Sequence, residues 1–141
     1  MSSSIYDAPR TDWATVWAPR ALAVMRIVVA LLFIEHGTQK LFSFPSTPPV
    51  GNPPLFALLW FAAVLEAGGG LLVALGLFTR PVAFLLSGEM AVGYFMDHAP
   101  RGFFPVLNGG EGAILYCFVF LYLAAAGAGA WSLDRARGTS L

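Results

Sequence analysis

The 141-residue sequence carries little charge and a single cysteine. Eight basic and eight acidic residues give a formal net charge of zero, and charged residues make up 11% of the chain against about 25% in a typical soluble protein. No basic patch is available to displace counterions from phosphates, so we expect no nucleic-acid partner. The lone Cys117 cannot form an internal disulfide or a CxxC redox pair, and we expect it to be a small buried hydrophobe.

Apolar residues account for 57% of the chain, and four apolar stretches cover residues 21–42, 54–78, 81–98 and 111–130. A helix rises about 1.5 Å per residue, so about 20 residues cross a hydrocarbon core of about 30 Å. We therefore predict an all-α integral membrane protein, a four-helix bundle with four transmembrane spans in the lipid bilayer. The first stretch exceeds the about 7–15 residues of a signal-peptide core, so we expect it to remain as an anchor.

Lysine and arginine are unevenly divided between the two ends of the predicted bundle. The end of the bundle that includes both termini carries five of them, whereas the opposite end carries only Lys40 and Arg101. The positive-inside rule therefore places both termini in the cytoplasm. Within the first stretch we expect Arg26 to snorkel to the cytoplasmic surface. The five residues on the cytoplasmic side are Arg10, Arg20, Arg80, Arg135 and Arg137.

These features predict three parts: a cytoplasmic N-terminal segment (1–20) with interfacial tryptophans, a four-span domain (21–130) and a cytoplasmic tail (131–141). A short internal repeat further suggests two similar helical hairpins. Residues 33–37 and 95–99 share the order aromatic, apolar, acidic, histidine and small, and a Phe-Pro pair follows each. Two hairpins in the same orientation would be related by a pseudo-two-fold axis along the membrane normal.

The ionisable residues of the predicted spans gather between the midplane and the non-cytoplasmic surface. An ionised side chain at the centre of a span costs about 2.5–3.5 kcal/mol on insertion, so these residues should face inward and be paired or protonated. Glu66 and Glu89 lie near the middle of their stretches, and we expect them to share protons or hydrogen bonds. The candidate catalytic residues are Glu66, Glu89, His98 and Glu111, and the candidate substrate-binding residues are Glu35, His36, Lys40 and Asn108.

Helical spacing predicts which of these residues share a face. Glu89 and Asp97 are two turns apart and should point the same way. Glu35 and His36 differ by about 100° in direction, so at most one of them faces the site squarely. Asn108 is expected near the cap of the last helix and Glu111 in its first turn, a position that capping alone would explain.

Three interpretations fit this cluster of residues, and a fourth, a metal site, fits it less well. A structural polar network would need no ligand. Carboxylates and histidines beside aromatic side chains, which make up 14% of the chain, suit a quinone site that handles protons. Acids near the midplane also suit proton-coupled transport of a small solute. We expect no metal site, because the Glu-x-x-His spacing of di-iron bundles is absent, as are phosphate loops and zinc motifs.

Several short motifs, taken in order, resemble the DoxX family. They are Gly37–Lys40, Glu66–Gly70, Leu75–Pro81, His98, Asn108–Glu111 and Trp131–Asp134. The resemblance spans about residues 21–135 and implies a four-helix protein of the bacterial inner membrane. One branch, DoxD, is the larger subunit of a thiosulfate:quinone oxidoreductase, and other members are linked to oxidative-stress or thiol-redox assemblies. The recurring family positions correspond to Lys40, Glu66, Arg80, His98, Asn108 and Glu111.

We therefore predict an integral membrane component of a quinone-linked or oxidative-stress redox system, with an oxidoreductase subunit as one candidate. Its carboxylate, histidine and lysine pocket is expected to open to the non-cytoplasmic side. Quinone is the expected small molecule, and a protein partner or a second copy of the chain is expected beside it. We do not expect thiosulfate as the substrate, because its oxidation would need extra soluble length and a second subunit that this sequence does not supply. The alternative is a non-enzymatic membrane scaffold or a proton-coupled small-solute transporter.

Overall fold

The computed structural model describes residues 12–138, so the N-terminal residues up to 11, Arg10 among them, and residues 139–141 lie outside the described residues. All regular secondary structure in the described part is helical, which confirms the predicted all-α class. The helices are α1 (Trp13–Phe42), α2 (Leu58–Leu75), α3 (Thr79–Gly93), a π-helix (Tyr94–His98), a 3₁₀ helix (Ala99–Arg101), α4 (Pro105–Asn108), α5 (Glu111–Ala126) and α6 (Leu133–Ala136). Both α1 and α2 are long and apolar enough to cross a membrane, and α5 is a shorter apolar helix.

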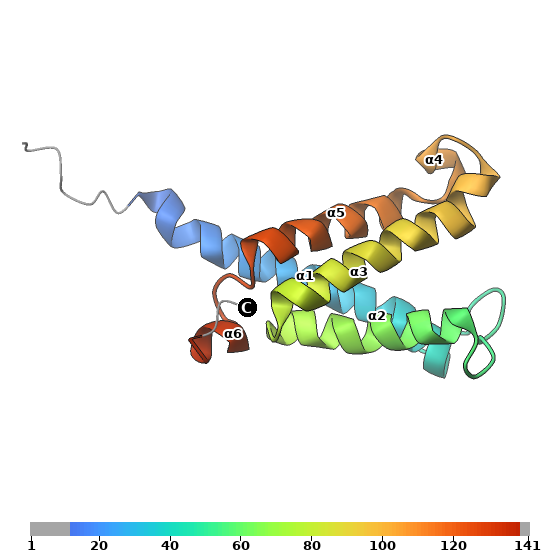
Figure 1. The fold of residues 1–141 in the computed structure, drawn as a ribbon, viewed down its shortest axis with the longest axis horizontal. Coiled ribbons are helices and arrows are strands. Elements are labelled where there is room, and N and C mark those ends of the chain that lie inside the picture. The colour runs from blue at the N-terminus through green and yellow to red at the C-terminus, as the bar shows by residue number, and fades with distance from the viewer. Residues whose placement is uncertain (1–11, 139–141) are drawn as a thin grey trace, which may run out of the picture.

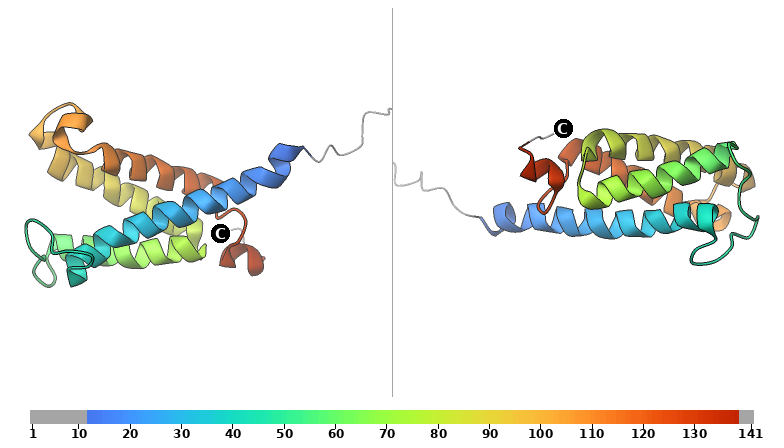
Figure 2. Two further views of the ribbon diagram at one scale, coloured as in Figure 1. Left: turned by 180° about the vertical axis from the view of Figure 1, so that it is seen from behind. Right: turned by 90° about the horizontal axis from the view of Figure 1, so that it is seen from below.

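The long helices form two pairs, α1 with α2 and α3 with α5, and α2 also contacts α3 (Figure 1). The connections 43–57 and 94–110 lie at one end of the molecule, and the start of α1 lies with α6 at the other (Figures 1 and 2). This pairing matches the predicted hairpins. The repeat does not extend to packing, however, because Phe33 is buried and Phe95 is exposed.

An apolar core joins the two helix pairs. Its members come from all four long helices and are Ala30, Phe33, Val73, Ala83, Leu86, Phe120 and Leu123. The rings of Phe33 and Phe120 meet edge to face, with their centroids 4.8 Å apart. Large apolar side chains also cover the outer faces of the helices, among them Val28, Phe84 and Phe118. Such broad exposed apolar surface is typical of contact with lipid and is rare on a soluble monomer.

Glycines allow α1 and α2 to approach closely. A Cβ added at Gly37 would lie 2.5 Å from the backbone nitrogen of Ala67 and 2.7 Å from the carbonyl oxygen of Ala63. A Cβ added at Gly70 would lie 2.7 Å from the side chain of Ile34. Small residues at a crossing are the usual means of packing helices in lipid.

The N-terminal part of the described chain is more helical than expected. Helix α1 begins at Trp13 rather than at residue 21, and Pro19 lies inside it. The carbonyl of Pro19 accepts a hydrogen bond of 2.9 Å from the backbone N–H of Ala130. The C-terminal segment therefore holds this early part of α1 in place. A contact between residues so far apart in sequence leaves no local pattern from which to predict it.

Arg26 is fully buried, so the prediction that it snorkels to the surface was wrong. Its guanidinium donates hydrogen bonds to four backbone carbonyls: those of Val73 (2.6 Å), Ala74 (2.5 Å), Ala128 (2.9 Å) and Trp131 (2.9 Å). The last carbonyls of a helix lack partners within the helix, and its C-terminus attracts positive charge. Arg26 thus joins the end of α2 to the C-terminal segment.

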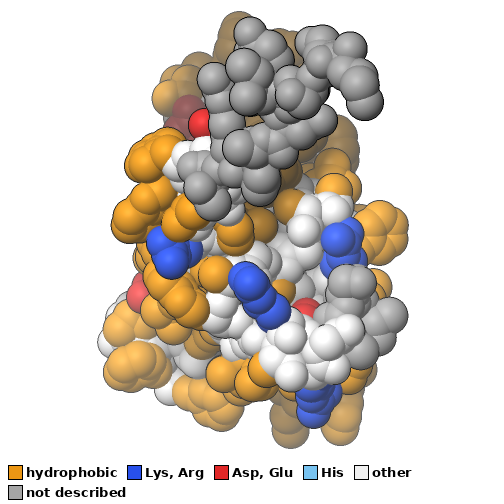
Figure 3. All heavy atoms as spheres, turned by 90° about the vertical axis from the view of Figure 1, so that its left-hand side faces the viewer, with side chains coloured by type: hydrophobic (Ala, Val, Ile, Leu, Met, Phe, Trp, Pro, Cys, Tyr) orange, Lys and Arg blue, Asp and Glu red, His pale blue; other side chains and the backbone are white. Residues whose placement is uncertain are grey.

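Asp134 makes a second tie at the same end of the molecule. Its two carboxylate oxygens accept hydrogen bonds from the backbone N–H groups of Phe78 (2.8 Å) and Thr79 (2.9 Å), where α3 begins. Its own backbone N–H donates to the carbonyl of Gly76 at 2.9 Å. The motifs Leu75–Pro81 and Trp131–Asp134 therefore meet, and these contacts give them a structural role. Figure 3 views this end, where basic side chains stand apart among apolar ones.

Candidate functional site

An ion pair crosses the interface between α1 and α2. The ammonium nitrogen Nζ of Lys40 lies 2.5 Å from Oε1 of Glu66. Lys40 belongs to the last turn of α1, whereas Glu66 lies in the middle of α2 and is 3% exposed. Gly37, one turn before Lys40, provides the close approach that lets the lysine reach this depth. The buried carboxylate is thereby compensated by a partly exposed cation.

Glu89 on α3 joins this pair. Both of its carboxylate oxygens are buried, and neither has a hydrogen-bond partner among the described residues; the same holds for Oε2 of Glu66. The charges of Glu66 and Lys40 both act on Glu89. One cation and two carboxyl groups are electrically neutral when one carboxyl holds a proton. A native structure rarely leaves buried polar atoms unsatisfied, so these oxygens single out the cluster Lys40–Glu66–Glu89 as the candidate site.

The site forms a layer directly beyond the apolar core, toward the end with the long connections. Three helices each place an ionisable side chain one turn from a core residue. The pairs of core residue and ionisable residue are Phe33 and His36 on α1, Leu86 and Glu89 on α3, and Phe120 and Tyr116 on α5. The core therefore closes the layer on the side of the two termini.

His36 and Tyr116 meet across α1 and α5. Their rings are edge to face with centroids 5.9 Å apart, and Tyr116 also contacts Phe33 at 5.1 Å. The charge of Glu35 acts on Tyr116 as well. Both Glu35 and His36 are exposed and lie at the edge of the layer. Sequence reasoning missed Tyr116, although its position one turn before Phe120 was a usable signal.

His98 and Asn108 form a separate group in the connection between α3 and α5. Nδ1 of His98 lies 3.1 Å from the carbonyl oxygen of Asn108, and its ring stacks on Tyr94 with centroids 6.2 Å apart. Asn108 is buried; its amide donates to the carbonyl of Gly102 at 2.8 Å, and its Oδ1 accepts from the N–H of Gly110 at 2.8 Å. These bonds shape the loop that leads into α5.

Two further acids lie away from the cluster. Asp97 is exposed and pairs with Arg101 at 2.7 Å, so the prediction that it points the same way as Glu89 was wrong. The intervening π-helix bonds residue i to i+5, and this change of period turns Asp97 aside. Glu111 is exposed in the first turn of α5, where it was expected. No hydrogen bond or ion pair between described residues joins Glu111 to the cluster.

Cys117 is half-buried on α5, and its backbone carbonyl accepts a hydrogen bond of 2.9 Å from the hydroxyl of Ser87. Within residues 12–138, no three histidine, cysteine or acidic side chains converge as a metal site would require. The structure thus divides the predicted residues into the buried cluster, the aromatic edge at Glu35 and His36, the loop group of His98 and Asn108, and the separate Glu111.

Comparison with known proteins identifies the family. A family model described as DoxX matches residues 21–99, more than half of the chain. An uncharacterised protein of Haemophilus influenzae is 50% identical over 84% of this chain and 92% of its own length. Two inner membrane proteins of Escherichia coli, YphA and YqjF, are 34% and 32% identical over 83% and 79% of this chain, and over 90% and 88% of their own. No solved structure matches the chain. The chain therefore belongs to the DoxX family.

Proposed function

We propose that this chain is a four-span protein of the bacterial inner membrane, with its spans within residues 21–130. The two relatives from Escherichia coli carry the name inner membrane protein. Helix α5 lies along α3, which continues without a break through the π-helix and the 3₁₀ helix to Arg101. Exposed apolar side chains such as Leu85 and Leu115 give both helices a surface suited to lipid.

We further propose that both termini face the cytoplasm, with residues 1–20 and 131–141 on that side. The start of α1 and α6 share one end of the molecule, and Arg20, Arg135 and Arg137 lie exposed there. The positive-inside rule assigns this end to the cytoplasm. Single cysteines at residues 103 and 137, introduced with Cys117→Ala, test the assignment. An impermeant maleimide added to intact cells should label residue 103 alone; labelling of residue 137 alone would reverse the orientation.

The buried cluster supports a role in handling protons for a quinone-linked or oxidative-stress redox system. Oxidation of a quinol releases two electrons and two protons. Glu66 and Glu89 provide carboxyl groups within the membrane that accept a proton, and Lys40 offsets the negative charge that remains. In this scheme an oxidising cofactor of a partner protein takes both electrons, the cluster takes one proton, and the second proton leaves through water. The single observation that carries this proposal is the buried carboxyl of Glu89, which has no hydrogen-bond partner among residues 12–138, beside the Lys40–Glu66 ion pair.

The other predicted residues have places in the same scheme. His36 and Tyr116 form an aromatic edge against which a quinone ring can stack, next to Glu35. His98 and Glu111 lie nearer the non-cytoplasmic surface and would pass protons to water. Asn108 holds the backbone around His98. In this scheme the site opens away from the cytoplasm, because the apolar core closes the other side.

Quinone binding to the purified chain tests this function. The chain in nanodiscs should retain quinone through purification, detected in a solvent extract, and should bind added ubiquinone or menaquinone saturably. Glu89→Gln keeps the shape of the side chain but removes its titratable carboxyl proton. With ferricyanide supplied as the electron acceptor, we expect at least a tenfold loss of the quinol-dependent proton release that exceeds that of protein-free nanodiscs. Arg137→Gln is the control and should leave it unchanged. An extract without quinone, together with no saturable binding, would refute the quinone site.

Proton-coupled transport of a small solute is the second candidate, supported by the same buried carboxyls. The effect of a pH gradient on solute uptake distinguishes transport from the quinone-linked role. Proteoliposomes that carry a transporter would accumulate solute when the gradient is imposed, and Glu89→Gln would abolish the accumulation. A scaffold would show neither quinone binding nor uptake, and its Glu89→Gln variant would change only stability.

A further inference from the structure

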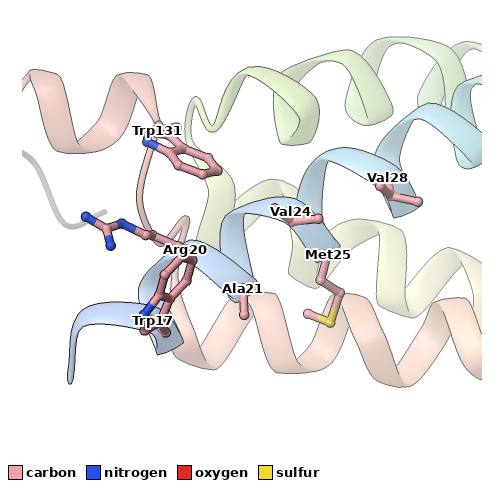
Figure 4. A pocket seen from close by; sticks show the side chains of 7 residues that line it. All are labelled: Trp17, Arg20, Ala21, Val24, Met25, Val28 and Trp131. Atoms are coloured by element: carbon pink, nitrogen blue, oxygen red, sulfur yellow. The ribbon is translucent and has the colours of Figure 1, made fainter. Parts of the chain in front are cut away.

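An apolar groove of about 480 Å³ runs along α1 near the end where both termini lie (Figure 4). It is lined by Trp17, Arg20, Ala21, Val24, Met25, Val28 and Trp131. We propose that this groove binds one anionic phospholipid, whose phosphate lies at Arg20 and whose acyl chain follows Val24 and Val28. This site is distinct from the cluster Lys40–Glu66–Glu89 and does not depend on its function.

The polar groups of the groove lie together at one end. The guanidinium carbon of Arg20 lies 5.2 Å from the ring centroid of Trp17, an arrangement that holds the cation beside the groove. In Figure 4 the guanidinium and the indole nitrogens of Trp17 and Trp131 point toward the same end. A guanidinium donates paired hydrogen bonds to a phosphate, and indoles favour the headgroup region. This end therefore has the chemistry of a lipid headgroup site.

The rest of the groove suits an acyl chain. Val24 and Val28 lie four residues apart, so they follow one another along the same face of α1. Each is about half exposed, although both belong to the apolar part of the helix. The groove walls around them are aliphatic or thioether side chains without charge. An acyl chain that lies here covers apolar surface that the protein itself leaves open.

The backbone of Trp131 shows that one wall of the groove is held in place. Its φ of 52° is left-handed, a strained conformation for a bulky residue. Its carbonyl is fixed by the buried guanidinium of Arg26 at 2.9 Å. The indole gains little burial in return, because it remains 62% exposed. The strained residue instead presents its ring to the groove, opposite Trp17, as expected for a binding wall.

Charge favours an anionic lipid over a neutral one. Arg20, Arg135 and Arg137 are exposed at this end of the molecule, and no acidic residue lines the groove. Basic residues near a membrane surface each strengthen binding to anionic lipid about fivefold, or about 1 kcal/mol. Because only Arg20 lines the groove itself, it should account for most of the preference between headgroups.

Tryptophan quenching tests the proposal on the full chain. Trp13→Phe and Trp60→Phe leave Trp17 and Trp131 as reporters, since the chain has four tryptophans. The protein is placed in phosphatidylcholine vesicles that contain brominated phosphatidylglycerol or, for comparison, brominated phosphatidylcholine. The phosphatidylglycerol should bind about fivefold more tightly than the phosphatidylcholine. Arg20→Gln should reduce this ratio to about one, whereas Arg137→Gln should preserve most of it.

Circular dichroism is the control for folding of Arg20→Gln. We expect this variant to fold, because Arg20 is exposed. A ratio near one in the unsubstituted reporter protein would overturn the proposal, as a neutral lipid or quinone in the groove would give that result. A preference for phosphatidylglycerol that survives Arg20→Gln would also overturn it, because the charge would then act from elsewhere on the surface. If quenching by both lipids is lost when the protein-to-lipid ratio is raised, a second copy of the chain occupies the groove, and the proposal is overturned.

Discussion

Lys40 and Glu66 form an ion pair of 2.5 Å although one lies at the end of its helix and the other in the middle of the next. The side chain of Glu66 is 4% exposed and that of Lys40 is 29% exposed. Lys40 thus extends inward from the rim of the bundle to a carboxylate that water does not reach. The pair links the rim at the end with the long connections to the layer that contains Glu89.

Removal of Lys40 alone should destabilise the protein strongly. Lys40→Met leaves Glu66 without its cation, and breaking a buried pair in this way costs about 3–5 kcal/mol. Adding Glu66→Gln should recover much of that loss, since the charge that needed Lys40 is gone. Unfolding in mixed SDS micelles measures Lys40→Met, Glu66→Gln and the double variant. Losses that simply add in the double variant would show that the two side chains are not coupled.

Gly37→Ala should weaken the contact between α1 and α2. The new methyl group would lie 2.5 Å from the backbone of Ala67, where no side chain can give way, and such overpacking costs about 1–3 kcal/mol. Gly68→Ala is the matched control, because nothing lies within 4 Å of its Cβ position. The control should be neutral or stabilise the helix by up to about 1 kcal/mol. Equal melting temperatures for the two variants would contradict the close crossing.

Arg26→Met should loosen the C-terminal segment. Four carbonyls would lose their donor, and hydrogen bonds to charged groups contribute about 1.5–3 kcal/mol each when removed singly. Arg26→Lys should rescue this only in part, because an ammonium lacks the planar fork of donors. Trypsin cleavage after Arg135 in detergent reports the release of the segment. Cleavage as slow in Arg26→Met as in the native chain would show that other contacts hold it.

Asp134→Ala should destabilise the start of α3. Loss of a carboxylate that caps a helix N-terminus costs about 0.5–2 kcal/mol, and Asp134→Asn, which keeps one acceptor oxygen, should lose less. Asp97→Ala is the control: it removes an exposed pair with Arg101 four residues away, a contact of about 0.3–0.5 kcal/mol, and a longer contact of 3.9 Å with the imidazole of His98. Thermal unfolding in detergent ranks the three variants. A larger loss for Asp97→Ala would contradict the capping role.

The helical class and the pairing of helices were predictable because they depend on local features. The lengths of the apolar runs predict helices that suit a bilayer, and the short internal repeat favours two similar hairpins. Glu66 and Glu89 were recognised because acids are costly in the middle of apolar helices. That they share Lys40 was not predictable. It depends on the crossing at Gly37, which sets how deep the lysine reaches.

The errors came from contacts between distant residues and from a change in helical period. Arg26 was placed at the surface because its distance from the helix end resembles that of a snorkelling residue. Its burial depends on Ala128 and Trp131, whose segment folds back over α1. Asp97 was given the direction of Glu89 on the assumption of a regular α-helix, and the π-helix at Tyr94–His98 breaks that regularity.

The placement of Arg26 also bears on how the protein is made. Two of its four acceptors, at Ala128 and Trp131, are translated 102 and 105 residues after it. Helix α1 is therefore made before any of the four acceptors, and its cation is fully satisfied only after the C-terminal segment has left the ribosome. A reporter fused before residue 128 would interrupt this final step, whereas one attached after residue 138 would leave it intact.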